Sequence, residues 1–224
     1  MLIFRETPMQ KSNRNRIVLG IIFIVPLIFY LFLSSGINNF AKLPVVTKTV
    51  VDVSNINDKN TFQKKISIVC FLGNDSQSVK GAFFNLNQKI YKQFLGFKDF
   101  QIIAIYPNES EEDIEKLKGE LGAFTNMIRW KFVAASTAEI KIIFDSLNTN
   151  LSLNENLFTN YAFIIDKEGN LRGRTNDDDF KDGKLFGYNM ISVAELNDKM
   201  KDDVKVVLAE YRLALKKNDA DREI

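Results

Sequence analysis

Cys70 is the one side chain in this sequence that could act as a thiol nucleophile, and the 224 residues include no histidine. Histidine supplies most acid–base catalysis near neutral pH, and without it no serine–histidine pair can form. One cysteine also cannot form an intramolecular disulfide or a Cys-x-x-Cys redox pair. The sequence therefore excludes histidine-dependent catalysis and paired-thiol redox chemistry.

Cys70 lies within 65–72, a nearly continuous apolar run that predicts a buried central strand. A free cysteine in such a strand is usually a small core residue, whereas a reactive thiolate needs exposure and nearby positive charge. We expect Cys70 to be a core residue. The alternative, a one-cysteine reductase or peroxidase that uses Cys70, stays open.

The segment 177–183 contains four aspartates, Asp177, Asp178, Asp179 and Asp182, followed by Gly183. A helix–loop–helix calcium site needs oxygen ligands at its first, third and fifth positions and glycine at the sixth. Lys181 and Asp182 occupy the fifth and sixth positions here. We therefore expect a solvated loop and no metal site.

Ser76, Ser78 and Lys80 stand at the start of a predicted helix, where free backbone N–H groups can bind an anion. Helix capping explains the serines equally well, and Lys80 is expected to face solvent.

Four apolar residues lie in the polar loop before the last predicted helix: Phe180, Leu185, Phe186 and Tyr188. Such side chains dock a partner when they are exposed. We expect them to pack beneath their own domain, and partner docking is the alternative.

The elements that would position these residues follow from the apolar patterns. Strands are predicted at 45–53, 65–72, 100–106, 130–133, 161–166 and 171–174. Helices are predicted at 76–94, 110–121, 136–147 and from 192 to about 215; Ser110 and Ser136 open capping-box patterns, and Ser192 caps the last helix. This alternation, closed by a hairpin and a helix, predicts parallel crossovers with an antiparallel edge pair, which is the thioredoxin layout.

Residues 17–35 form an apolar run behind a basic flank that contains Lys11, Arg14 and Arg16. At about 1.5 Å per residue, a helix of this length spans most of a hydrocarbon core of roughly 30 Å. Positive flanks stay in the cytoplasm. We therefore expect a single-pass anchor in a bacterial inner membrane, with the N-terminus cytoplasmic and the folded domain periplasmic. A cleaved signal peptide is the alternative.

The domain resembles the Sco/SenC family, which is thioredoxin-like, membrane-anchored and assists copper delivery to cytochrome oxidase. The resemblance covers about Val51 to Leu215. It is carried by the buried strand that ends in Phe71, Leu72 and Gly73, by the helix after it, and by 163–173, which is similar to the family's aliphatic–Asp-x-x-Gly-x-aliphatic-Arg-Gly stretch.

The family's metal ligands do not carry over to this sequence. Ser76 and Lys80 occupy the positions of its two cysteines, and Phe158 or Thr159 occupies the position of its histidine. Copper(I) favours thiolate and imidazole ligands, which none of these side chains provides. The resemblance therefore implies a degenerate member, for which we expect no catalytic residue, no cofactor-binding residue and no metal ligand.

The predicted fold class is α/β: a thioredoxin-like fold with a central mixed sheet flanked by helices, preceded by one N-terminal transmembrane helix. We divide the chain into a cytoplasmic basic tail at 1–16, the anchor at 17–35, a linker at 36–44, the Sco-type domain at 45–217 and a polar tail at 218–224.

The net charge of +2, with acidic and basic residues interleaved, gives no reason to expect nucleic-acid binding. We expect a non-catalytic, membrane-anchored binding or assembly module with a protein partner in the envelope. The family resemblance implies respiratory oxidase assembly as its setting. The alternatives are a thiol redox enzyme that uses Cys70 and a structural envelope protein.

Overall fold

The computed structural model describes residues 11–34, 42–74, 76–180 and 182–220. The chain divides into two compact units, Met1–Phe40 and Ala41–Ile224. The first unit contains the helix α1 (Lys11–Ser34), on which the predicted anchor falls except for its last residue, which lies outside the described residues. Among the described residues, no helix has both the length and the apolarity that crossing a membrane requires. The structure thus provides no support for the transmembrane helix predicted at 17–35.

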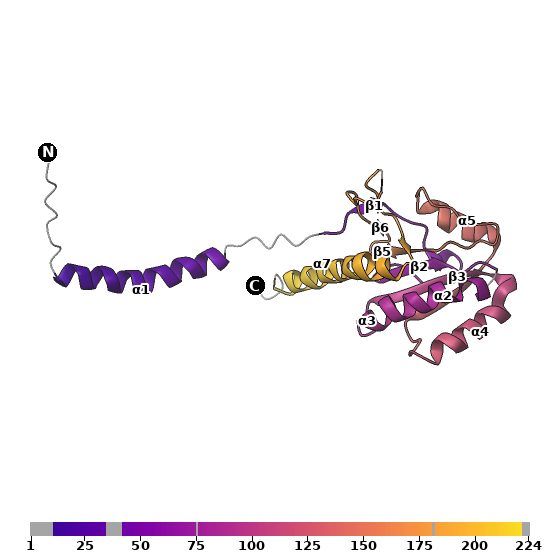
Figure 1. The fold of residues 1–224 in the computed structure, drawn as a ribbon, viewed down its shortest axis with the longest axis horizontal. Helices are drawn as coiled ribbons and strands as arrows, with labels where there is room; N and C mark the ends of the chain where they lie inside the picture. Colours follow the sequence, from indigo (N-terminus) through magenta and orange to yellow (C-terminus); the bar gives the residue numbers. More distant parts are fainter. Residues whose placement is uncertain (1–10, 35–41, 75, 181, 221–224) are drawn as a thin grey trace. The chain divides into compact units, whose positions relative to one another are not determined.

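The second unit contains a sheet and its covering helices (Figure 1). Its strands are β1 (Val45–Thr47), β2 (Ile66–Phe71), β3 (Phe100–Pro107), β4 (Trp130–Ala135), β5 (Tyr161–Ile165), β6 (Leu171–Arg172) and β7 (Tyr188–Asn189). Its α-helices are α2 (Ser76–Leu86), α3 (Lys92–Phe94), α4 (Glu111–Gly122), α5 (Thr137–Ser146), α6 (Val193–Glu195) and α7 (Lys201–Ala220).

The strands form a mixed sheet in the order β1-β6-β5-β2-β3-β4, with β7 paired to β5. β2, β3 and β4 are parallel, because α2 to α3 and then α4 return the chain to the same end of the sheet. β5 runs antiparallel to β2 and forms a hairpin with β6. The order β3-β2-β5-β6, with a closing helix, is the thioredoxin arrangement, so the predicted α/β fold with a central mixed sheet is confirmed.

Side chains along each strand alternate between the two faces of the sheet, and both faces are buried. Ile68, Cys70 and Leu72 belong to one core, together with apolar side chains of α2, α4 and α7. Val69 and Phe71 belong to the other core, which α5 and the segment before β2 cover. Both described cores are built from Leu43 onward, so the second unit carries its own hydrophobic core.

The strand predicted at 45–53 is shorter than expected. β1 ends at Thr47, and Thr49 then adopts a positive φ of 55°. Asp52 caps a short 3₁₀ helix, because its carboxylate accepts hydrogen bonds from the Ser54 N–H and from the Thr61 hydroxyl. A β-rich composition is overridden here by local side-chain-to-backbone bonding.

The four predicted helices are confirmed, two of them with a π-helical turn. Residues Asn87–Tyr91 join α2 to α3, and Leu196–Met200 join α6 to α7. The capping box at Ser136 is confirmed, since its hydroxyl accepts from the Glu139 N–H while the Glu139 carboxylate accepts from the Ser136 N–H.

The capping box predicted at Ser110 is wrong. A 3₁₀ turn, Asn108–Ser110, precedes α4, and the Ser110 hydroxyl donates to the Asn74 side chain at 3.4 Å instead of capping the helix. Ser192 does cap the last helix, by accepting a hydrogen bond from the Glu195 N–H at 3.2 Å.

Candidate functional site

Open α/β sheets place ligands beyond the carboxyl ends of their parallel strands. Three segments meet there, namely 72–74 after β2, 107–110 at the end of β3, and 154–158 before β5. We name this region the carboxyl edge. Leu72 forms a β-bridge with Phe158, and the Asn74 N–H donates to the Asn156 carbonyl at 2.9 Å.

The loop 154–158 lies directly against the turn after β2. Gly73 has a φ of +67°, and a Cβ at this position would lie 2.4 Å from the Asn156 carbonyl oxygen and 2.7 Å from the Phe158 Cβ. The Asn154 side chain holds the loop by accepting from the Asn156 and Phe158 N–H groups at 3.0 and 2.9 Å. The turn after β2 is therefore packed against backbone.

Cys70 lies two residues before this turn and is fully buried. Its thiol donates weakly to the Ile103 carbonyl at 3.7 Å, and burial raises the pKa of the thiol well above its ordinary value. The prediction that Cys70 is a core residue is confirmed. A thiol in this position lacks both the exposure and the cationic neighbour of a reactive cysteine.

The predicted anion-binding group at the start of α2 is only partly described. The side chains of Ser76 and Ser78 lie outside the described residues, so their capping and anion-binding roles stay predictions. Lys80 does not simply face solvent: it forms an ion pair with Glu120 of α4 and lies 5.9 Å from the centre of the Phe84 ring. Its charge is therefore directed toward α4.

The two alternatives for the family histidine position differ in burial. Phe158 is half-buried and packs against the core that faces α2, whereas Thr159 is buried, with 5% of its surface exposed. Neither residue offers a nitrogen or sulfur ligand.

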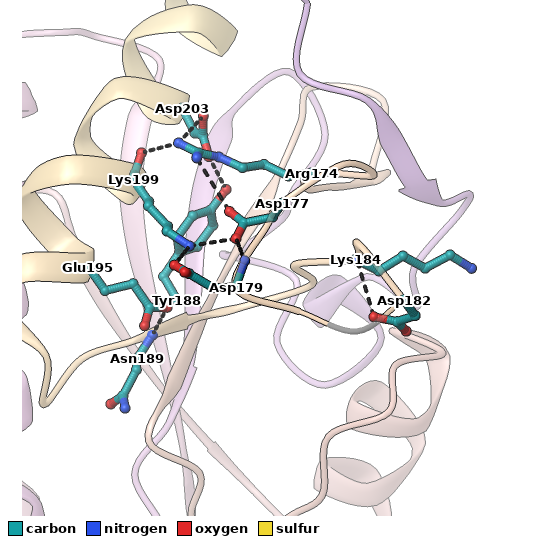
Figure 2. Close-up of polar contacts among 10 residues, drawn as sticks. All are labelled: Arg174, Asp177, Asp179, Asp182, Lys184, Tyr188, Asn189, Glu195, Lys199 and Asp203. Carbon is teal, nitrogen blue, oxygen red and sulfur yellow. Dashed lines mark hydrogen bonds and ion pairs between the residues drawn. The ribbon is translucent and has the colours of Figure 1, made fainter.

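The acidic loop is held by ion pairs, as Figure 2 shows. Lys199 donates to Asp177 at 2.6 Å and to Asp179 at 2.5 Å, and Asp182 accepts from the Lys184 N–H at 3.1 Å. The prediction of a solvated loop is therefore wrong for Asp177, which is buried because Lys199 and the adjacent Arg174 neutralise it. Within the described part of the chain, no group of acidic side chains is arranged to hold a metal ion.

A second set of contacts joins this loop to α7. Asp203 accepts from Arg174 Nε at 2.7 Å, from Arg174 Nη2 at 3.2 Å and from the Tyr188 hydroxyl at 2.6 Å (Figure 2). Burial, followed by the charge of Asp203, raises the pKa of Tyr188 well above its ordinary value. The tyrosine is thus a neutral donor fixed inside the protein.

The four apolar residues of the loop before the last helix belong to the interior. Leu185 and Tyr188 are buried, Phe180 packs against one core, and Phe186 packs against the other. The expectation that this loop packs beneath its own domain is confirmed.

The stretch that carries the family resemblance has a structural role. Asp166 accepts from the Glu168 and Asn170 N–H groups and from Arg172 Nη1, the last at 3.1 Å. Arg172 also donates to the Leu43 carbonyl at 2.7 Å and to Glu210 of α7 at 2.6 Å. These contacts fasten the start of the folded unit to the hairpin and to the last helix.

Sequence reasoning missed both arginine networks. Asp203 and Glu210 lie seven residues apart on α7, which is close to two helical turns. Both side chains therefore lie on the same face of the helix, beside its apolar stripe. Charged side chains spaced along the edge of an apolar stripe, together with Arg172 and Arg174 on the hairpin, were the available signal.

No protein-family model matches this chain, and no curated protein matches it. Solved structures that resemble it include Sco/SenC proteins and thioredoxin-like oxidoreductases. BsSco, a member of the Sco family of cytochrome c oxidase assembly proteins, is 14% identical, with a TM-score of 0.44 over 77% of this chain and 98% of its own.

A SCO1/SenC family lipoprotein from Bacillus anthracis is 16% identical, with a TM-score of 0.44 over 76% of this chain and 99% of its own. A thioredoxin-family thiol:disulfide interchange protein from Chlorobium tepidum is 16% identical, with a TM-score of 0.43 over 72% and 99%. These low identities and TM-scores add nothing about function, and the thioredoxin-like arrangement of the chain rests on its own strand order.

Proposed function

We propose that this protein is a membrane-anchored, non-catalytic binding or assembly module of thioredoxin-like fold. The observation that carries the proposal is the carboxyl edge, where Gly73, Asn154 and Phe158 pack the turn after β2 against backbone. The space beside Gly73, in the turn after β2, is occupied by the chain's own loop 154–158.

The carboxyl edge carries two exposed carboxylates, Glu109 and Glu155, and its other polar side chains are neutral. Asn74 and Ser110 contact each other at 3.4 Å, and Asn154 is bonded to its own loop. Amide and hydroxyl groups donate and accept hydrogen bonds, but a hydroxyl becomes a nucleophile only beside a base. Ser110, the one hydroxyl residue in these segments, contacts an amide and not a base, so such an edge suits recognition of another polypeptide better than group transfer.

We infer the anchor from the sequence, because the apolar run 17–35 follows a group of basic residues. We expect the protein to stay in the membrane fraction after an alkaline carbonate wash, and the folded unit to be digested by protease added to spheroplasts. Release by carbonate would exclude the anchor. A mature protein whose mass lacks residues 1–35 would establish a cleaved signal peptide.

Respiratory oxidase assembly is the setting that the sequence resemblance suggests, with an envelope protein as partner. We expect deletion of the gene to lower the level of mature oxidase, and the wild-type chain and Cys70→Ala to restore it equally. Normal oxidase in the deletion strain would exclude this setting. Failure of a folded Cys70→Ala variant to restore oxidase would favour the thiol enzyme instead.

Copper binding separates a degenerate module from a copper carrier. Titration of the full chain with copper(I), in the presence of a competing chelator, is expected to show no stoichiometric binding, because thiolate and imidazole ligands are missing from the predicted positions. Tight binding of one copper per chain that Cys70→Ala abolishes would overturn the proposed module.

A further inference from the structure

The amino ends of the parallel strands, opposite the carboxyl edge, surround a hollow of about 290 Å³. Five cationic side chains and no carboxylate line this hollow: Lys59, Lys65, Lys98, Arg129 and Lys131. We name these five residues the basic amino edge. The whole chain has a net charge of only +2, so this concentration of one sign is local.

Most of these cations have no acidic partner. Among the described residues, no carboxylate lies within ion-pairing distance of four of these side chains, namely Lys59, Lys98, Arg129 and Lys131. Lys65 lies 3.6 Å from Asp99, but that carboxylate is engaged by Lys167 at 2.6 Å. A concave surface with unneutralised charges of one sign attracts anions.

Backbone carbonyls hold some of the cationic groups in place without neutralising them. Arg129 donates to the carbonyls of Leu95 and Lys98 at 2.7 and 2.9 Å, and Lys65 donates to the Lys98 carbonyl at 3.2 Å. Like charges are therefore kept close together by the fold, which costs stability unless an anion binds.

A second hollow of about 240 Å³ adjoins the first and shares Lys98 with it. It adds Lys167 and Arg212, so the two hollows together present seven cations and one carboxylate, Asp99. Phe97, in the second hollow, is 44% exposed, and Ile128, in the first, is 66% exposed. Basic residues with exposed apolar side chains among them are typical of surfaces that bind lipid headgroups.

The chain enters the folded unit beside this surface. The Leu43 N–H donates to Glu210 at 2.9 Å, and the next residues of α7, Tyr211 and Arg212, line the second hollow. Residues 36–42 are seven in number and reach at most about 25 Å when extended. This step rests on the proposed anchor: if the anchor ends at residue 35, the length of the linker keeps Leu43 within about 25 Å of the bilayer.

We propose that the basic amino edge docks on the anionic phospholipid surface of the membrane, with lysine and arginine contacting headgroup phosphates and Phe97 and Ile128 entering the interface. The carboxyl edge, at the other end of the strands, then points away from the lipid toward a protein partner.

The test uses the unit 41–224 without the anchor, which carries its own core, so that a failed anchor and a failed docking surface are separated. Co-sedimentation is measured with vesicles of phosphatidylcholine alone and with about 30% phosphatidylglycerol. We expect binding only to the anionic vesicles, weakened at least about tenfold between roughly 50 and 300 mM salt. The variant Lys59→Gln/Lys98→Gln/Lys131→Gln should lose at least about tenfold in binding.

The matched control removes three exposed lysines elsewhere on the same unit, Lys48→Gln/Lys141→Gln/Lys184→Gln, and should bind within about twofold of wild type. No binding to anionic vesicles at low salt, or equal losses in the two triple variants, would overturn the proposal. Displacement of the vesicles by millimolar glycerol phosphate would also overturn the proposal, because it would identify a site for free phosphate. Equally tight binding to an RNA oligomer would show a polyanion site and overturn it as well.

Discussion

Asp203 accepts three hydrogen bonds from two residues of the hairpin and loop, although it lies on the last helix. Arg174 keeps about a quarter of its side chain exposed, whereas the Asp203 side chain is about nine-tenths buried. A buried carboxylate with a bidentate arginine and a tyrosine hydroxyl is fully satisfied, and removing its charge leaves the guanidinium with only the longer ion pair to Asp177, at 3.4 Å. Arg174, Tyr188 and Asp203 therefore stabilise the fold, and we assign them no part in the proposed binding.

Asp203→Asn should lower the free energy of unfolding by about 2–3 kcal/mol, because Arg174 loses the closer of its two carboxylate partners in a largely buried site. Urea denaturation followed by circular dichroism measures this loss. The adjacent Asp202→Asn is the matched control: Asp202 pairs with Lys205 at an exposed position, so the change should cost less than about 0.5 kcal/mol. Equal losses in the two variants would contradict the assigned role of Asp203.

At the scale of the elements, the turn after β2 and the loop 154–158 form one packed unit. Gly73 is required there for two reasons: its positive φ and the short distance to the Asn156 carbonyl. Gly81 in α2 differs from Gly73, because a Cβ added at Gly81 would have no atom within 4 Å.

Gly73→Ala should destabilise the protein by at least about 2 kcal/mol, since it combines a left-handed backbone with a steric clash. Gly81→Ala should stabilise it by about 0.5–1 kcal/mol through helix propensity. Thermal unfolding of the two variants measures both signs. A neutral Gly73→Ala would mean that the loop 154–158 does not pack against the turn.

The acidic loop is coupled to the π-helical turn Leu196–Met200 through a titrating group, the carboxyl of Asp177. Burial alone would raise the pKa of Asp177, but the hydrogen bonds from Lys199 and from the Asp179 N–H, with the charge of Arg174, outweigh it and lower the pKa below its usual value. A carboxyl whose folded pKa is lowered contributes stability above its unfolded pKa of about 4, and this contribution is lost as the pH falls through the folded pKa.

We therefore expect the free energy of unfolding to fall as the pH drops from about 5 to about 3. Asp177→Asn should be less stable than wild type at pH 7, and the difference should shrink as the pH falls through the lowered pKa of the wild-type carboxyl. Urea titrations at several pH values provide the measurement, with the exposed neighbour Asp178→Asn as the control. A constant difference between Asp177→Asn and wild type would argue against titration of Asp177.

At the scale of the whole molecule, the second unit contains the sheet, both cores and the two arginine networks. Arg172 closes it at its start, by bonding the Leu43 carbonyl, and at its end, by bonding Glu210. Arg172 thus joins the first and the last segments of the folded unit.

A protein that begins at Ala41 should unfold in one cooperative transition, within about 2 °C of the full chain in detergent. Calorimetry of both forms checks this. Arg172→Ala in the same unit should lower the midpoint by several degrees, because it leaves Asp166 and Glu210 without their common partner. A truncated protein without a cooperative transition would show that residues before 41 contribute to the core.

The sequence by itself determined the order of the helices and of the strands other than β7, the thioredoxin-like arrangement and the burial of Cys70. These follow from hydrophobic periodicity and from Gly, Pro and capping residues, all of which act over a few neighbouring positions. The lack of histidine and of a second cysteine likewise needed no structure.

Only the tertiary structure decided what the charged residues do. Asp177 lies beside Lys199, Lys80 beside Glu120 and Arg172 beside Glu210, and each pair joins elements far apart in the sequence. The basic amino edge likewise gathers residues from 59 to 131, which interleaved charge in the sequence conceals. Long-range pairing of polar side chains leaves no local pattern, because it depends on how strands and helices meet in space.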